Sequence, residues 1–162
     1  MRASVLVSLV RRLLTLEAAE GQDQDSVIGA AERVSDKLRA HLSKRIGQEG
    51  FQVLLARALT LATARFPHLS AVRVDADGSL IGLRRAADVG SQRTSDSITQ
   101  QDAVEGVVAL VAELLGLLMT FIGEDLTLRL LSTVSPGLAI PELDSDDAAG
   151  RMRNDERTKQ GR

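Results

Sequence analysis

The chain has 162 residues, enough for one domain with a substantial hydrophobic core. Apolar residues make up 44% of it, charged residues 26%, and its three phenylalanines are joined by no tyrosine or tryptophan. The 20 basic and 22 acidic residues give a net charge of −2, which provides no general attraction to nucleic-acid phosphates. The absence of cysteine excludes disulfides, thiolate catalysis and cysteine-based metal sites. We therefore expect an aliphatic core and no nucleic-acid partner.

Apolar residues near the N-terminus recur at helical intervals over residues 5–14 and predict a first helix that ends near Gly21. The same segment has some features of a secretory signal. However, Arg11 and Arg12 interrupt its apolar run, and no small-residue cleavage site follows at a suitable distance. An amphipathic helix explains the segment better, and the expected location of the protein is the cytoplasm.

Two further helices are predicted between residues 25 and 65. Apolar residues follow steps of three and four over residues 27–46, with charged residues on the opposite face, and Gly47 is well placed to end this helix. A third helix is predicted over residues 49–65, and Pro67 prevents it from extending much further.

After Pro67 the spacing of apolar residues is no longer that of a helix and becomes that of a β-strand. Short apolar stretches flank the sequence 75–79, which contains Gly78, and predict a β-hairpin within residues 71–83. The two aspartates of this turn also suggest a calcium loop. That loop needs its glycine at the sixth position and a glutamate at the twelfth, whereas counting from Asp75 the glycine is fourth and the twelfth residue is Ala86. The turn interpretation is therefore preferred.

Beyond the hairpin, the polar composition of residues 84–97 predicts a mobile loop. A fourth helix is predicted over residues 102–122 and a shorter last helix over residues 125–134. The final residues, 141–162, are strongly charged and poor in apolar side chains, which predicts a disordered tail after a single domain of residues 1–140. The expected fold is mostly α, a bundle of about five helices with a small β-hairpin inserted between helices 3 and 4.

The predicted fourth helix is the most apolar segment of the chain. Only Glu113 and Thr120 are polar between residues 107 and 122. These residues would span about 24 Å as a helix, less than the roughly 30 Å hydrocarbon core of a bilayer. A buried core helix therefore fits the segment better than a membrane span.

Small residues gather on one side of this helix. Winding it at the helical period places Ala109, Ala112 and Gly116 on a narrow stripe, with bulky side chains over the remaining sector. The stripe indicates either a narrow solvent face or a place where another helix packs closely. The bulky sector must be covered by other helices of the chain or by a second subunit.

No strong catalytic or cofactor motif is found. There is no phosphate-binding loop, dinucleotide fingerprint, paired-histidine metal motif or nucleophile elbow, and we expect no cofactor or metal. The polar residues that remain as candidates for a buried network or a ligand contact are Glu113, Glu124, Asp125, Arg129 and His68. For each of them a purely structural role is the alternative, and catalysis would require Glu113, Glu124 and His68 to converge.

These observations favour a non-catalytic helical interaction or regulatory protein that self-associates through apolar helix faces. Its partners would be further copies of the chain or another protein, with no membrane involved. The alternative is a small-molecule sensing or binding domain with an apolar pocket between its helices.

Overall fold

The structure is a computed structural model that describes residues 2–18, 24–92 and 100–140. The fold is mostly α, as predicted, with one small antiparallel hairpin in which Arg73 pairs with Ile81 and Val74 with Leu80. In chain order the elements are α1 (Ala3–Glu17), α2 (Gln24–Arg65), the 3-10 turn η1 (Pro67–Ala71), β1 (Arg73–Val74), β2 (Leu80–Ile81), α3 (Leu83–Gln92), α4 (Gln100–Ile122) and α5 (Glu124–Val134).

Helix α2 bends sharply at Gly47, which we call the elbow. Gly47 has φ 79° and ψ 162°, a conformation outside the helical region that only glycine adopts readily. The predicted second and third helices are the two halves of α2, 24–46 and 48–65. When the halves are counted separately, the hairpin lies between the third helix and the next long one, as predicted.

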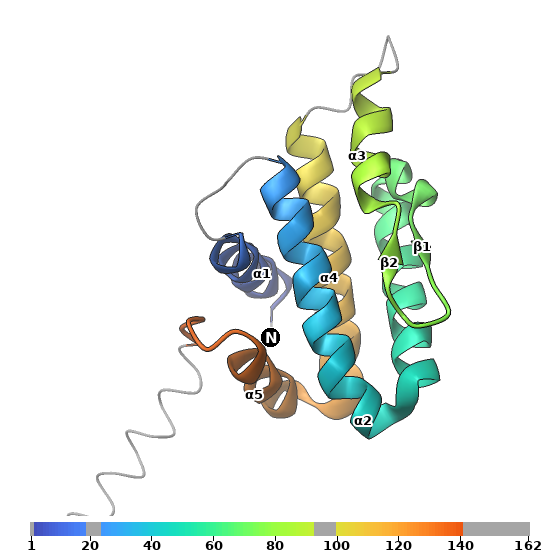
Figure 1. The fold of residues 1–162 in the computed structure, drawn as a ribbon. Helices are drawn as coiled ribbons and strands as arrows, with labels where there is room; N and C mark the ends of the chain where they lie inside the picture. Colours follow the sequence, from blue (N-terminus) through green and yellow to red (C-terminus); the bar gives the residue numbers. More distant parts are fainter. Residues whose placement is uncertain (1, 19–23, 93–99, 141–162) are drawn as a thin grey trace, which may run out of the picture.

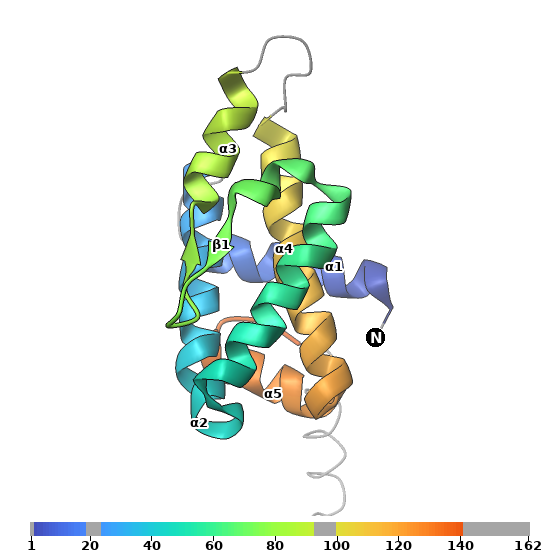
Figure 2. The ribbon, with the colours of Figure 1, turned by 90° about the vertical axis from the view of Figure 1, so that its right-hand side faces the viewer.

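The two halves of α2 run along α4 on different sides of it, and together they make its largest interface (Figures 1 and 2). Helices α1 and α5 lie across the long axis of α4, α1 near its middle and α5 at its C-terminal end (Figure 2). The chain itself therefore covers most of α4. The buried residues of α4 are Ala103, Gly106, Val107, Val108, Ala109, Leu110, Val111, Ala112, Leu114, Leu115 and Leu118.

By length and composition α4 could cross a membrane, and it is the one such helix in the described part of the chain. More than half of its most apolar window is buried against other helices of the chain. In this structure α4 is a core helix, and inserting it in lipid would require the surrounding helices to leave it.

The prediction of a loop over residues 84–97 was wrong for residues 84–92, which belong to α3. Leu83, Ala86 and Ala87 are all buried, and their spacing of three and four residues gives this short helix one apolar edge. The polar residues between them dominate the composition and hide that edge. Residues 93–99 and the predicted disordered tail 141–162 lie outside the described residues.

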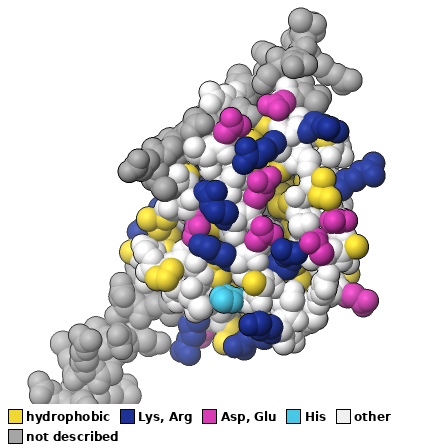
Figure 3. Space-filling model, viewed as in Figure 1, with side chains coloured by type: hydrophobic (Ala, Val, Ile, Leu, Met, Phe, Trp, Pro, Cys, Tyr) yellow, Lys and Arg dark blue, Asp and Glu magenta, His cyan; other side chains and the backbone are white. Residues whose placement is uncertain are grey.

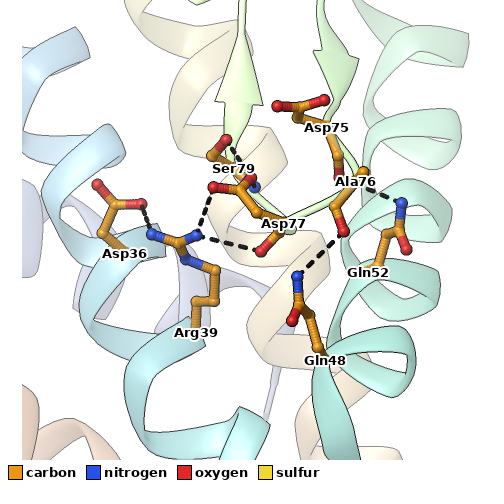
Figure 4. A network of polar contacts seen from close by, with 8 residues as sticks. All are labelled: Asp36, Arg39, Gln48, Gln52, Asp75, Ala76, Asp77 and Ser79. Atoms are coloured by element: carbon orange, nitrogen blue, oxygen red, sulfur yellow. Dashed lines mark hydrogen bonds and ion pairs between the residues drawn. The ribbon is translucent and has the colours of Figure 1, made fainter.

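The tip of the hairpin is bound to both halves of α2 (Figure 4). From the first half, Arg39 donates to the backbone oxygen of Asp77 at 3.1 Å and to its carboxylate at 2.9 Å. From the second half, Gln48 and Gln52 donate to the backbone oxygens of residues 76 and 75, each at 3.1 Å. The tip thereby bridges the angle of the elbow and helps to hold the two halves in place.

Replacing Gly47 with alanine should lower the free energy of unfolding by about 1–3 kcal/mol. No atom lies within 4 Å of the position that the new Cβ would take, so the loss would come from backbone strain rather than a steric clash. Urea denaturation of the full chain measures it.

Gly50 provides the matched control because it lies in the regular part of the same helix. Its added Cβ would make ordinary contact with Ile46 at 3.4 Å, so Gly50→Ala should leave stability unchanged or raise it by up to about 1 kcal/mol. Equal losses at Gly47 and Gly50 would show that the elbow does not depend on the unusual backbone of Gly47.

Candidate functional site

The polar residues singled out in the sequence do not form one site. His68 lies against Gly106, whereas Glu113 is seven residues further along α4, a rise of about 10 Å. Glu124 lies beyond the end of α4 in the first turn of α5. The convergence that catalysis by Glu113, Glu124 and His68 would require is therefore not present.

Glu113 takes part in a partly exposed contact rather than a buried network. Its carboxylate lies 4.0 Å from a guanidinium nitrogen of Arg65, and the two side chains retain 32% and 66% of their exposure. An ion pair this exposed contributes little to stability.

The acidic residues that follow α4 lie at the start of the next helix. Gly123 turns the chain with φ 92° and ψ 158°, and Glu124 and Asp125 occupy the first turn of α5, where negative charge is favourable. Asp125 and Arg129 are spaced i,i+4 on α5, but Arg129 is exposed and forms no ion pair with Asp125 in the described part of the chain.

The small-residue stripe of α4 lies beneath α1. One helical turn before Ala109, Arg11 contacts the carboxylate of Glu105, with a nitrogen–oxygen distance of 2.5 Å. Further along, the side chain of Leu6 would lie 3.7 Å from a Cβ added at Gly116, which is an ordinary contact distance. Ala109 and Ala112 are buried between these two contacts. The neighbour of this stripe is therefore a helix of the same chain, and it leaves room for a methyl group at Gly116.

The close approach on α4 occurs instead at Gly106. A Cβ at this position would lie 2.6 Å from Nε2 of His68 and 3.5 Å from Cβ of Phe66, so the imidazole packs directly against the helix backbone. Nε2 is buried and has no hydrogen-bond partner. Burial lowers the pKa of His68, while the negative charge of Asp102 acts in the opposite direction. His68 is thus a neutral packing residue between η1 and α4.

A groove of about 750 Å³ opens between the end of the first half of α2 and one face of α5. It lies on the side of the elbow where Ile46 precedes Gly47, and Ile122 contributes from the last turn of α4. We refer to it as the elbow groove. Its lining residues are His41, Leu42, Lys44, Arg45, Ile46, Ile122, Leu126, Arg129, Leu130 and Thr133.

The elbow groove combines an apolar floor with a basic rim. Five of its ten lining residues are leucine or isoleucine, three are lysine or arginine, one is histidine, and none is acidic. Lys44, Arg45 and Arg129 are exposed and form no ion pair within the described residues. In the space-filling view of Figure 3, lysine and arginine side chains lie beside a histidine at the lower end of the molecule.

Of the residues proposed from the sequence, only Arg129 lines this groove. His41, Lys44 and Arg45 belong to the predicted helix over residues 27–46, and nothing local in the sequence shows that α5 packs beside them. A signal was nevertheless present in the sequence. Ile-Gly followed by two polar residues occurs at 46–49 and again at 122–125, and both glycines turn the chain with nearly the same backbone angles. The two turns place Ile46 and Ile122 in the same groove.

Within the described residues, no three histidine or acidic side chains come together where they could hold a metal ion. The Asp77 carboxylate of the hairpin instead accepts hydrogen bonds from the backbone and hydroxyl of Ser79, which hold its pKa below the ordinary value, with help from Arg39. The turn interpretation of residues 75–79 is therefore supported over the calcium loop.

No family model matches the chain, and no curated protein or solved structure matches it.

Replacing Gly106 with alanine should lower the free energy of unfolding by about 1–3 kcal/mol, because the new methyl group and the His68 ring cannot occupy the same space. The corresponding change at Gly116 should be neutral or stabilising by up to about 1 kcal/mol, since it meets Leu6 at an ordinary distance.

A double-mutant cycle identifies the cause. If His68 is the obstacle, combining Gly106→Ala with His68→Ala should cost clearly less than the sum of the two single changes in chemical denaturation. Additive losses would mean that the close approach of His68 and Gly106 does not exist in solution.

Proposed function

We propose that this protein is a non-catalytic interaction module that binds an acidic amphipathic helix of a partner protein in the elbow groove. The observation that carries the proposal is the composition of the groove, an apolar floor with a basic rim and no acidic lining residue. A helix laid into a hydrophobic groove is a common mode of peptide recognition, with apolar anchors spaced at three and four residues.

One apolar side chain that lines the groove, and one next to it, are exposed enough for such a partner to cover. Leu126 is 53% exposed on α5, and Phe121, which is 66% exposed, precedes Ile122 at the end of α4. Large exposed apolar residues next to a groove offer positions where anchoring side chains can be buried. Binding a leucine-rich helix face here would remove this apolar surface from water.

The cations of the rim favour an acidic partner over a neutral one. Lys44 and Arg45 approach the groove from α2 and Arg129 approaches it from α5, so positive charge lies on both walls. Such rim charges accelerate association and select the partner more than they raise affinity. Glutamates flanking the apolar anchors of a bound helix would face these side chains.

A protein partner is favoured over self-association through α4. Self-association was expected because the bulky sector of α4 is wide, but α1, α2 and α5 of the same chain pack around it. Because α4 is a core helix here rather than a membrane span, we propose the cytoplasm as the location of the protein.

A second candidate function is the binding of a small anionic amphiphile. The groove volume of about 750 Å³ falls within the range of roughly 300–1,000 Å³ that is usual for small-molecule sites. Helix α3 lies at the opposite end of α4 from α5 (Figure 1), so residues 84–92 do not border this groove. Saturable binding of decanoate without binding of an acidic helical peptide would favour this candidate.

A synthetic helical peptide with leucines on one face and glutamates on the other should bind the full chain, as measured by fluorescence anisotropy. The double variant Lys44→Glu and Arg129→Glu should weaken this binding about tenfold or more. Each reversal replaces an attraction worth about 0.5–1 kcal/mol with a repulsion.

Two controls isolate the groove. Arg57→Glu removes an exposed cation that does not line the groove and should leave affinity almost unchanged. A peptide with lysines in place of glutamates should bind the original protein weakly and the double variant better. Arg57→Glu makes half the change in net charge of the double variant, so if it caused half or more of the loss in binding free energy, only the overall charge of the protein would matter and the proposed site would be rejected.

A further inference from the structure

We infer that the chain carries its own ligand for the elbow groove, and that residues 142–147 occupy it when no partner is bound. This inference rests on the proposed function, since it assumes that the groove accepts acidic segments with an apolar anchor. Such a contact would regulate binding, because a partner would have to displace residues 142–147 before it could enter the groove.

The composition of residues 142–147 complements that of the groove. Four of these six residues are acidic and one is Leu143. The first basic residue that follows the segment is Arg151. The groove presents the opposite pattern, with cations on its rim, leucines and isoleucines on its floor and no acidic side chain. A segment of this composition can place carboxylates at the rim and a leucine on the floor.

The position of the segment in the chain brings it close to the groove. After α5 the chain is fixed by Ser135, whose hydroxyl donates to the Glu17 carboxylate at 2.6 Å, and by the burial of Leu138 and Ile140. Hydrogen bonds from Lys37 and Ser135 and the charges of Lys37 and Arg33 outweigh the effect of burial and lower the pKa of Glu17, so the anchor is ionised at neutral pH. Figures 1 and 2 show the described chain ending beside α5.

The segment is also long enough to follow the wall that α5 gives the groove. That wall runs from Leu126 to Thr133, a rise of about 10 Å along a helix. Seven extended residues beyond Ile140 reach at most about 25 Å, which exceeds the length of the wall. Because the segment is tethered, its local concentration at the groove is high, and even a weak interaction would keep the groove largely occupied.

A spin label tests the placement directly in the full chain. The protein has no cysteine, so Ser145→Cys gives a single attachment site for a nitroxide. We expect the label to broaden the amide signals of residues 41–46 and 126–133 in a ¹H–¹⁵N NMR spectrum. The broadening should be the same in a diluted sample, because the contact is within one molecule. A label that broadens other surfaces, none, or these residues only at high protein concentration would overturn the inference.

Competition with the leucine–glutamate peptide tests the regulatory consequence. Neutralising the four carboxylates with Glu142→Gln, Asp144→Asn, Asp146→Asn and Asp147→Asn should tighten peptide binding about five- to tenfold, as expected when a competing segment fills 80–90% of the sites. Leu143→Ser should tighten it too, although the charge is unchanged. The matched control Arg151→Gln with Arg153→Gln should have no such effect.

The outcomes separate the two proposals. If the original protein and all variants bind the peptide equally, residues 142–147 do not occupy the groove, but the proposed function stands. If tightening follows the change in charge and Leu143→Ser has no effect, general electrostatics explain it and the inference is overturned. If no form of the protein binds the peptide, the proposed function fails, and the spin label alone decides where the segment lies.

Discussion

The packing of α4 in the angle between the two halves of α2 is the contact on which the other elements depend. α2 supplies the largest interface of α4 and buries Leu38 and Leu42 from its first half and Phe51 and Leu55 from its second. This arrangement requires the chain to reverse within one residue, which Gly47 allows. The hairpin tip then bridges the angle through Arg39, Gln48 and Gln52. Helices α1 and α5 cover further parts of α4.

The same bend also produces the elbow groove. Because Gly47 and Gly123 turn the chain in similar conformations, the residues just before them, Ile46 and Ile122, meet at one end of the molecule. Not all apolar side chains at this end are covered by the chain, since Leu126 on α5 and Phe121 at the end of α4 remain exposed. The functional proposal thus follows from how the core is closed.

Local sequence was sufficient for the long helices and insufficient for features that depend on tertiary contacts. The spacing of apolar residues correctly predicted the helices of α2 and α4, and Gly47 correctly predicted where α2 bends. Both features depend on residues that are near neighbours in the chain. α3 was missed because its apolar edge is only three residues long. Gly116 was chosen as a close-packing position, whereas Gly106 is the one that a side chain contacts closely, and nothing near it in sequence shows that His68 lies there. The groove was missed for the same reason, since its two walls are about eighty residues apart.

Native-state hydrogen exchange of the full chain tests most directly whether α4 is the core of a self-contained fold. We expect amides of residues 107–118 to exchange only through global unfolding. The free energy of their exchange should equal that from denaturation and should not differ between dilute and concentrated samples. Exchange of these amides at much lower free energy, or protection that rises with protein concentration, would contradict it. The first result would mean that α4 is loosely held, and the second that another copy of the chain supplies its cover.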